Sequence, residues 1–328
     1  MKSDLEPKRL PGARKAAMPD FISPQLATLV KEAPTGDHWF HELKFDGYRF
    51  LCHINRRKVR FWTRNQKDWT DKFPNLLRAV QSIPATTAIL DGEVIVLDPK
   101  HLSSFQKLQQ ALGKGDDKLI YEVFDLIYLD GFDLTRCALK DRKSLLAKLF
   151  ASTGARGPVR YSDHIEGNGS AFFRKACDHG IEGIVSKLAS APYESSRNRN
   201  WLKVKCGQRQ EFVIAGYTPS EKGLAFASLI LGVYEKGELV YSGRVGTGFS
   251  DRFRAELRKK LDKISRPTSP FATTPRESGL REAHWVTPKL VAEVAFTEWT
   301  SDGSIRHPSF QGLREDKKPE EIRRESPA

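Results

Sequence analysis

The sequence predicts an α+β fold divided into two domains, and three observations support this prediction. The chain has 328 residues, more than one ordinary hydrophobic core accommodates. Segments that alternate apolar and polar residues, typical of strands, are interspersed with segments of helical period. The pattern of predicted elements changes after Cys206-Gly207, from interspersed strands and helices to strands with a single helix. We therefore expect a leader over residues 1–36, a first domain over 37–206 and a second domain over 207–328.

The residues before Trp39 carry recurrent prolines and little apolar periodicity, so residues 1–36 are interpreted as an extended leader. Such a segment is typical of a flexible tail or of a linker left from a larger polypeptide.

In the first domain, the patterns predict strands of antiparallel sheets with flanking helices. Aromatic and β-branched residues or period-2 alternation predict strands at 39–54, 58–64, 89–98, 118–129, 183–188 and 201–205. Apolar residues at helical spacing predict helices at 71–83, 141–150 and 170–180. Ser170 and Gly180 supply a typical N-cap and C-terminal residue for the last of these.

In the second domain, strands are predicted at 211–217, 225–234, 238–245 and 290–299, with a turn at Lys236-Gly237. A helix is predicted at 251–264, capped by Ser250, with one apolar face. Four or five strands and one helix in about 120 residues suit a small β-barrel of the OB type. The basic face of the helix is either an ordinary solvated face or part of a DNA-binding surface; its residues are Arg252, Arg258, Lys259 and Lys263.

Composition and charge restrict the class of function. Lysine and arginine total 54 and aspartate and glutamate 41, so the formal net charge is +13. This balance favours a polyanionic partner, nucleic acid first and an anionic surface second. Aliphatic runs such as Val94–Leu97 are far shorter than the roughly 18 residues that a membrane helix needs. The polar residues 1–6 do not resemble a signal peptide, so we expect a cytoplasmic protein with no membrane partner.

The four cysteines are Cys52, Cys137, Cys177 and Cys206, and they form no Cys-x-x-Cys pair. This spacing excludes a zinc ribbon and argues against a disulfide framework, as is typical of a reducing cytosol.

Lys44 is the first residue with a candidate chemical role. It lies at the end of a predicted strand, within Lys-Phe-Asp-Gly at 44–47. Such a turn either simply ends the strand or presents a nucleophile. A nucleophilic lysine needs a pKa below its usual value of about 10.4, which neighbouring cations or burial provide.

Two carboxylates and two lysines complete the candidate chemistry. Glu93 and Glu182 each lie close to the start of an apolar strand, where a charged group is usually just solvated. Together they also suit Mg²⁺, which takes one or two carboxylates plus phosphate oxygens. Alternation places Lys203 and Lys205 on one strand face, where their mutual repulsion favours an anion such as phosphate between them.

The order of these motifs resembles that of the covalent nucleotidyltransferases and, within them, the ATP-dependent DNA ligases. The motifs are Lys-x-Asp-Gly at 44–47, Asp-Gly-Glu at 91–93, Phe-Asp-Leu-Ile-Tyr-Leu-Asp-Gly at 124–131, Glu-Gly-Ile-Val-x-Lys at 182–187 and Leu-Lys-Val-Lys at 202–205. Residues 63–70 and 306–317 are similar to the ligase domain of bacterial end-joining ligases of the D type. The resemblance covers residues 20 to 320. It implies an ATP-grasp-like adenylation domain followed by an OB-fold β-barrel.

The resemblance also implies a reaction. Lys44 would attack the α-phosphorus of ATP, with Mg²⁺ or Mn²⁺ as the metal, and form lysine-AMP. The AMP would pass to a DNA 5′-phosphate, and a 3′-hydroxyl would displace it. Each step is a phosphoryl transfer, for which positioning and charge neutralisation dominate catalysis.

The resemblance assigns the other site residues. Glu42 would contact the adenine amino group, Phe124 would stack on the base, and Arg49 would reach the ribose or a DNA phosphate. The full ATP-binding set is Glu42, Arg49, Arg64, Glu93, Phe124, Lys187, Lys203 and Lys205. Glu93 and Glu182 match the family's ligands of the metal or the ribose, and the resemblance does not say which residue has which role. The residues Arg314, Asp316 and Lys317 would orient pyrophosphate, which requires the second domain to close over the ATP site.

The partners implied are nicked or broken duplex DNA, a Ku-type end-binding protein, and polymerase and phosphoesterase modules outside this chain, which we expect to be a monomer. Two alternatives remain. One is an RNA ligase or a capping guanylyltransferase, which the choice of ATP or GTP would distinguish. The other is a non-catalytic nucleic-acid-binding protein on the same scaffold. The intact set of Lys44, Glu93, Glu182, Lys203 and Lys205 argues against it.

Overall fold

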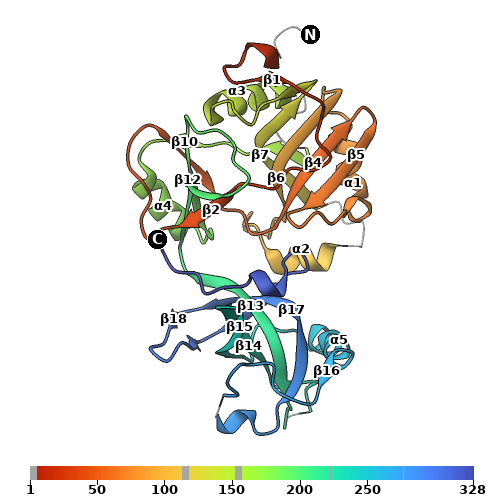
Figure 1. The fold of residues 1–328 in the computed structure, drawn as a ribbon, viewed down its shortest axis with the longest axis vertical. Helices are drawn as coiled ribbons and strands as arrows, with labels where there is room; N and C mark the ends of the chain where they lie inside the picture. Colours follow the sequence, from red (N-terminus) through yellow and green to blue (C-terminus); the bar gives the residue numbers. More distant parts are fainter. Residues whose placement is uncertain (1–5, 113–117, 152–156, 222, 276) are drawn as a thin grey trace. The chain divides into compact units, whose positions relative to one another are not determined.

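The computed structural model describes residues 6–112, 118–151, 157–221, 223–275 and 277–328. Contacts divide the chain into two compact units (Figure 1). The first unit comprises Met1–Cys206 with Pro327–Ala328, and the second comprises Gly207–Ser326. Each is described separately below.

The larger sheet of the first unit has the order β1-β8-β7-β6-β4-β5, and β9 pairs with β7 in parallel. Its strands are β1 (Arg14–Lys15), β8 (Phe132–Asp133), β7 (Leu119–Leu129), β6 (Thr87–Val96), β4 (Tyr48–Asn55), β5 (Lys58–Thr63) and β9 (Val159–Tyr161). Every residue of β7 is buried, because this central strand is covered on both faces. The helices α1 (Pro74–Val80) and α3 (Leu139–Phe150) pack on β7, and α2 (Phe105–Ala111) packs on β6. A short 3-10 helix, η2 (Thr70–Lys72), precedes α1.

The second sheet of the first unit has the order β10-β3-β11-β12-β2. Its strands are β10 (Ile165–Glu166), β3 (Trp39–Leu43), β11 (Gly183–Leu188), β12 (Arg197–Lys205) and β2 (Leu26–Leu29). α4 (Gly169–Asp178) packs on β3 and β11, where Phe172 contacts an apolar cluster with Ile184 and Val204. Side chains alternate along a strand, so the strand neighbours of Ile184 and Val204 point to the other face of the sheet.

The interpretation of the N-terminal segment as a flexible tail is wrong for the described part of it. β1 pairs with β8, and β2 pairs in parallel with β12. A 3-10 helix, η1 (Pro7–Arg9), precedes β1, and Tyr128 Oη donates to the carbonyl of Ala16 at 2.8 Å. Pairing at a sheet edge stabilises this segment although its strands are only two and four residues long.

The second unit contains one antiparallel sheet of order β15-β14-β13-β17-β16, with β20 also paired to β17. Its strands are β13 (Gln208–Thr218), β14 (Ser228–Glu235), β15 (Glu238–Val245), β16 (Ser265–Arg266), β17 (His284–Phe296) and β20 (Ser309–Leu313), and β18 (Glu298–Trp299) pairs with β19 (Ile305–Arg306). α5 (Asp251–Asp262) is capped by Ser250 Oγ, and its Leu257 and Leu261 enter the core. The 3-10 helices η3 (Ser278–Leu280) and η4 (Pro319–Glu321) complete the unit.

The predicted fold class is confirmed, with one correction. Mostly antiparallel sheets and few helices form the two units, as the patterns predict. The expected closed barrel is not found among the described residues, because β15 and β16 end the strand order without pairing to each other.

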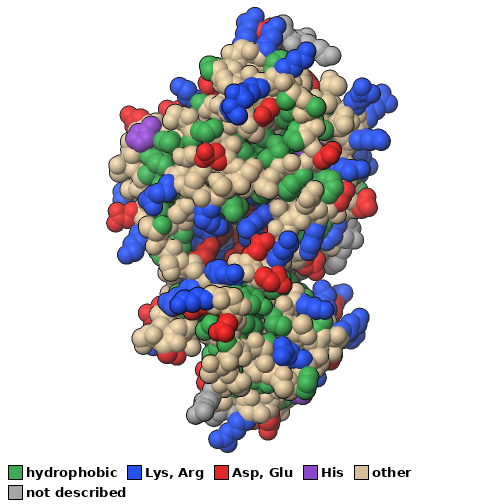
Figure 2. All heavy atoms as spheres, in the orientation of Figure 1, with side chains coloured by type: hydrophobic (Ala, Val, Ile, Leu, Met, Phe, Trp, Pro, Cys, Tyr) green, Lys and Arg blue, Asp and Glu red, His purple; other side chains and the backbone are tan. Residues whose placement is uncertain are grey.

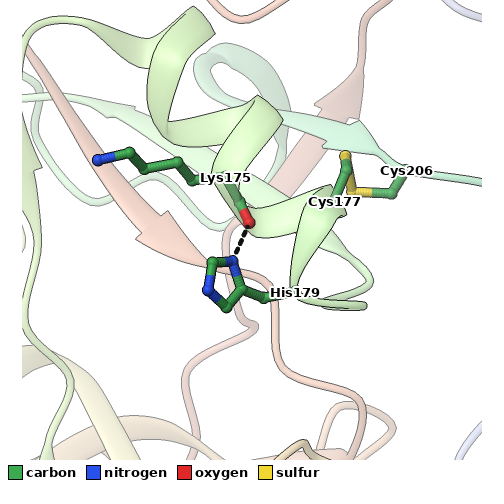
Figure 3. The surroundings of a disulfide bond; sticks show 4 residues. All are labelled: Lys175, Cys177, His179 and Cys206. Carbon is green, nitrogen blue, oxygen red and sulfur yellow. Dashed lines mark hydrogen bonds between the residues drawn. A yellow bond between two sulfur atoms is a disulfide. The ribbon is translucent and has the colours of Figure 1, made fainter.

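The expectation that the cysteines form no disulfide is also wrong. Cys177 and Cys206 are bonded, with their Cα atoms 5.3 Å apart (Figure 3). The pair is separated by 29 residues in sequence, and the two cysteines meet because α4 packs on β11 while β11 pairs with β12. Cys52 and Cys137 are buried free thiols, and burial raises the pKa of Cys137 to about 11.

Two features of the molecule bear on its possible partners, namely the distribution of surface charge and the character of its helices. Lys and Arg side chains lie on the drawn face of both units, mixed with Asp and Glu (Figure 2). None of the helices in the described ranges has the length and apolar character needed to cross a membrane.

Candidate active site

Strand register places Lys44 beside Lys205. The amide of Lys44 donates to the carbonyl of Gly183 at 3.0 Å, and Gly183 is the register partner of Lys205. Two strand spacings put the backbones of the two lysines about 10 Å apart. Gly183 has φ +152°, and a Cβ there would come within 2.0 Å of the Val204 carbonyl oxygen, so this position requires glycine.

A second row of residues lies one step further along the same strands. Val185 is the register partner of both Glu42 on β3 and Lys203 on β12. Residues opposite one another in a sheet point to the same face, and so do residues two apart on one strand. The sheet therefore presents Glu42, Lys44, Lys203 and Lys205 on one face, opposite the face that packs on α4.

The Lys44 ammonium contacts the Glu182 carboxylate, with Nζ and Oε1 2.6 Å apart. The side chains are 21% and 11% exposed, so solvent reaches both. The carbonyl of Glu182 also accepts from the amide of Cys206 at 3.0 Å, which fixes its backbone against the end of β12. A carboxylate at this distance favours the charged form of a lysine. Lys44 therefore needs a proton acceptor before it can act as a nucleophile, and Glu182 is adjacent to it.

Glu42 lies in a buried ion cluster between two lysines. Lys143 Nζ donates to Oε1 and Lys187 Nζ donates to Oε2, both at 2.7 Å. Lys143 also donates to the carbonyl of Ser162 at 2.9 Å. Burial lowers the pKa of Lys187 to about 8, and the nearby Lys143 contributes, although Glu42 opposes the shift. One carboxylate thus binds two ammonium groups, and burial lowers the pKa of one of them.

Phe124, the predicted base-stacking residue, is surrounded by cations. Lys187 Nζ lies 4.2 Å from the centre of the Phe124 ring and 4.3 Å from that of Trp201. The Arg49 guanidinium carbon lies 5.3 Å from each ring. These are cation–π distances. The aromatic pair therefore joins β7 of the larger sheet to β12 of the second sheet, next to the Glu42 cluster.

Arg49 is anchored rather than free to reach outward. Its Nε and Nη2 atoms donate to the two oxygens of buried Asp91, and Nη1 donates to the carbonyl of Gln25 at 2.6 Å. Tyr193 Oη donates to the same carboxylate at 2.7 Å. Burial opposes the charge on Arg49, but Asp91 outweighs it and raises the pKa. These bonds engage three of the five guanidinium donors.

Glu93 and Arg64 come from the larger sheet and its edge, not from the sheet that carries the Lys44 row. Glu93 on β6 is the register partner of Arg49 and of Glu122. Burial raises the pKa of Glu122 to about 7, although Arg160, 3.9 Å away, lowers it. Arg64 follows β5 and is half-buried. Glu93 and Glu182 thus come from different sheets.

The predicted pyrophosphate-orienting residues form an ion network inside the second unit. Arg314 donates to both oxygens of Asp316 and to Oε2 of Glu293, at 2.8–2.9 Å. Arg209 donates to Oε1 of Glu293 at 2.8 Å. Burial opposes ionisation of Glu293, but the two arginines lower its pKa to about 2. Lys317 pairs with Glu211 at 3.2 Å.

The donor set suits a metal that the protein holds with few ligands. In the part of the chain that the structure describes, no three His, Cys, Asp or Glu residues cluster as a metal cage. Mg²⁺ keeps several waters and takes one or two carboxylates plus substrate phosphates. Partly exposed Glu182 matches this requirement, and Glu93 is the second candidate.

Sequence reasoning missed Lys143, Asp91 and Glu122. Lys143 lies on the buried face of α3, between Leu139 and Leu146, where a cation is costly without a partner. That position was the available signal, but its partner Glu42 is about a hundred residues earlier. Asp91 lies within the Asp-Gly-Glu motif, of which only Glu93 was considered.

Comparison with known families identifies both units. Residues 24–205 match the family model described as "ATP dependent DNA ligase domain", and residues 222–317 match "ATP dependent DNA ligase C terminal region".

Individual relatives agree with these matches. The chain is 39% identical to the multifunctional non-homologous end joining protein LigD of Pseudomonas aeruginosa, over 96% of this chain and 38% of that protein. It is 31% identical to the prophage-derived DNA ligase-like protein LigB of Bacillus subtilis, over 90% of this chain and 99% of that protein. The chain thus spans well under half of LigD and nearly all of LigB.

Solved structures show the same similarity. A mycobacterial DNA ligase D complexed with ATP and MES superposes with a TM-score of 0.70 at 34% identity, over 93% of this chain and 98% of that one. The ligase domain of LigD from M. tuberculosis gives a TM-score of 0.52 at 35% identity, with the same coverage.

Proposed function

The chain belongs to the ATP-dependent DNA ligases, and from this we propose that Lys44 is the residue that accepts AMP from ATP and passes it to the 5′-phosphate of a DNA break. The observation that supports this role is the position of Lys44 at the end of β3, in contact with Glu182 and in one row with Lys205. A nucleophile, a proton acceptor and a phosphate-binding cation meet there.

The chemistry of the first step follows from these contacts. A bond forms between Lys44 Nζ and the α-phosphorus, and the bond from that phosphorus to the pyrophosphate oxygen breaks. The proton lost by the ammonium goes to Glu182, whose Oε1 is 2.6 Å away, or through it to water. Lys203 and Lys205 neutralise charge that develops on the α-phosphate and favour neutral Lys44.

Nucleotide and metal binding complete the proposed site. Glu42 is proposed to accept from the adenine amino group, with Lys143 holding its carboxylate in place. Phe124 would stack on the base, with Lys187 beside it and with Arg49 and Arg64 directed to the sugar and phosphates. Glu93 and Glu182 are the candidate ligands of Mg²⁺ or Mn²⁺, which when bound neutralises phosphate charge; in the step in which Glu182 takes the proton of Lys44, Glu93 would hold the metal.

The second unit is proposed to act on the leaving group. Arg314 and Lys317, with Asp316 positioning the arginine, would orient pyrophosphate as it leaves. This role requires the ion pairs of Arg314 and Lys317 to open or to be shared, because both cations have carboxylate partners within the second unit.

We further propose that the physiological reaction is end joining in DNA repair. The support is the similarity to LigD, whose printed name is that of an end-joining protein, although this chain spans only 38% of it. We propose that the protein acts in the cytoplasm as a monomer. Its proposed partners are a Ku-type protein and separate polymerase or phosphoesterase modules. An RNA ligase is the alternative, and sealing of matched DNA and RNA nicks distinguishes the two.

The proposal is tested by incubation with α-labelled ATP and Mg²⁺, followed by denaturing electrophoresis. We expect label on the wild type and on Lys100→Ala, an exposed lysine changed as control, and none on Lys44→Ala. Lys44→Ala should still seal a nick that is already adenylated, since the later steps do not use the free amine. Label on Lys44→Ala would overturn the assignment. DNA binding without label on any variant would favour the non-catalytic alternative.

A further inference from the structure

The disulfide between Cys177 and Cys206 is a feature that the proposed reaction does not use. Cys177 lies in the last turn of α4, and Cys206 directly follows β12 (Figure 3). Cys206 is exposed and Cys177 half-buried, so a dissolved thiol can reach the bond. The other two cysteines are buried in the core of the first unit.

The disulfide closes a covalent loop around much of the proposed active site. The loop contains the whole of β11 and β12. Four of the proposed ATP and metal ligands therefore lie between the two cysteines: Glu182, Lys187, Lys203 and Lys205. A cross-link restricts the conformations of everything within such a loop.

A short chain of bonds connects the disulfide to the nucleophile. The amide of Cys206 donates to the carbonyl of Glu182 at 3.0 Å, and the carboxylate of Glu182 contacts Lys44 Nζ at 2.6 Å. At the other end of the bridge, the amide of Gly180 donates to the carbonyl of Cys177 at 2.9 Å. His179 Nδ1 and the carbonyl of Lys175 also close the last turn of α4 (Figure 3). The segment that carries Glu182 is thus held from both sides.

We propose that Cys177 and Cys206 form a redox-modified site that controls the first step of the reaction. This inference rests on the proposed function of Lys44. In the oxidised protein the bridge keeps Glu182 against the end of β12 and next to Lys44, and adenylation is fast. Reduction frees Cys206, the last residue before the second unit begins, and loosens the Glu182 segment.

The modifying reagent is a dithiol, either a small molecule or a protein of the thioredoxin class. One of its sulfurs attacks the bridge and forms a mixed disulfide, and its second sulfur then displaces the remaining cysteine. The dithiol ends as a disulfide, and its two hydrogens end on Cys177 and Cys206. Two electrons are transferred, so atoms and charge balance.

The existence of the bridge is tested by counting thiols. Protein purified without reductant is unfolded and treated with a maleimide reagent, before and after dithiothreitol. We expect two reactive cysteines before reduction, Cys52 and Cys137, and four after it. Peptide mass spectrometry should show the two remaining cysteines linked. Four reactive cysteines before reduction would overturn the proposal.

The control of activity is tested by the rate of adenylation with α-labelled ATP in the two redox forms. We expect the oxidised protein to react at least threefold faster than the reduced protein. Cys177→Ser should match the reduced rate and ignore dithiothreitol, whereas Cys52→Ala, a cysteine outside the bridge, should keep the response. Equal rates in a protein with a demonstrated bridge would overturn the control. A bridge without adenylation in either form would instead contradict the proposed role of Lys44, and the thiol count would still decide the redox site.

Discussion

Two buried carboxylates, Glu42 in the first unit and Glu293 in the second, are each bound by two cations. The cations are lysines at Glu42 and arginines at Glu293. Glu42 has two lysines at 2.7 Å, and Glu293 has two arginines at 2.8–2.9 Å. A lysine is a point charge that loses its proton when buried, whereas an arginine stays charged and bonds through a planar fork. Lys187 accordingly has its pKa lowered by burial to about 8, while the arginines lower the pKa of Glu293 to about 2.

The difference between lysine and arginine partners determines which of the two clusters can change its charge near neutral pH. The cluster around Glu42 contains a lysine whose pKa burial lowers to about 8, so its charge changes within the range of mildly alkaline pH. The network around Glu293 is held by ions that cannot be neutralised near neutral pH, so it fixes the strands that carry Arg314. The comparison predicts that the two clusters respond to opposite ends of the pH scale.

The largest expected effect is that of Glu293→Gln. It removes the carboxylate that Arg209 and Arg314 share at largely buried positions, although Arg314 keeps its bonds to Asp316, and this loss costs about 3–5 kcal/mol at pH 7. Because the folded pKa of Glu293 is below its ordinary value, this stability is present above about pH 4.5 and lost as the pH falls toward 2. Urea unfolding of wild type and variant at pH 7 and pH 3 measures it. Glu315→Gln, at a half-exposed surface pair, is the control and should change little. A deficit that stayed constant to pH 2 would contradict the assignment.

The next effect is opposite in sign and concerns Lys187. Its folded pKa is about 8 against 10.5 for a free side chain, so the unfolded chain binds more protons between these values and stability rises with pH. Relative to Lys187→Met, the wild type should gain about 3 kcal/mol between pH 7 and pH 10.5. Lys100→Met should show no such trend, because Lys100 is exposed. The free energy of unfolding, measured with urea at several pH values, checks this prediction. If it changed with pH equally in the wild type and in Lys187→Met, the explanation would be wrong.

The smallest expected effect concerns Glu122, a buried carboxylate that lies 3.9 Å from Arg160. Its pKa is raised by burial to about 7, so the folded protein binds more protons than the unfolded chain and stability falls as the pH rises from 4.5 to 7. Relative to Glu122→Gln, the wild type should lose about 2–3 kcal/mol between pH 5 and pH 8, the range over which Glu122 loses its proton in the folded protein. Thermal unfolding at both pH values measures this, and a rise in relative stability would refute it.

The sequence predicts those parts of the site that depend on local pattern. Lys203 and Lys205 share a face because strand side chains alternate, as the register of β11 with β12 shows. Lys44 and Glu182 were both identified as candidates, and the structure brings them into contact. Their individual roles stay proposals, since the contact alone does not assign them.

The parts that the sequence does not predict depend on long-range pairing. Lys143 reaches Glu42 from a helix about a hundred residues later, and Cys177 reaches Cys206 only because β11 and β12 pair. The strand at 26–29 is four residues long and becomes recognisable only beside β12. In the second unit, β13 to β17 form an open strand order in the described ranges, which strand counting alone does not separate from a closed barrel.

The measurement that most directly tests the account is the location of AMP on the protein. Wild-type protein is incubated with ATP and Mg²⁺ without DNA, and its peptides are mapped by mass spectrometry under conditions that preserve the phosphoramidate. The account predicts a single AMP on the peptide that contains Lys44, which disappears when pyrophosphate is added in excess. AMP on Lys187 or on any other lysine, or no AMP on a protein that seals nicks, would contradict it.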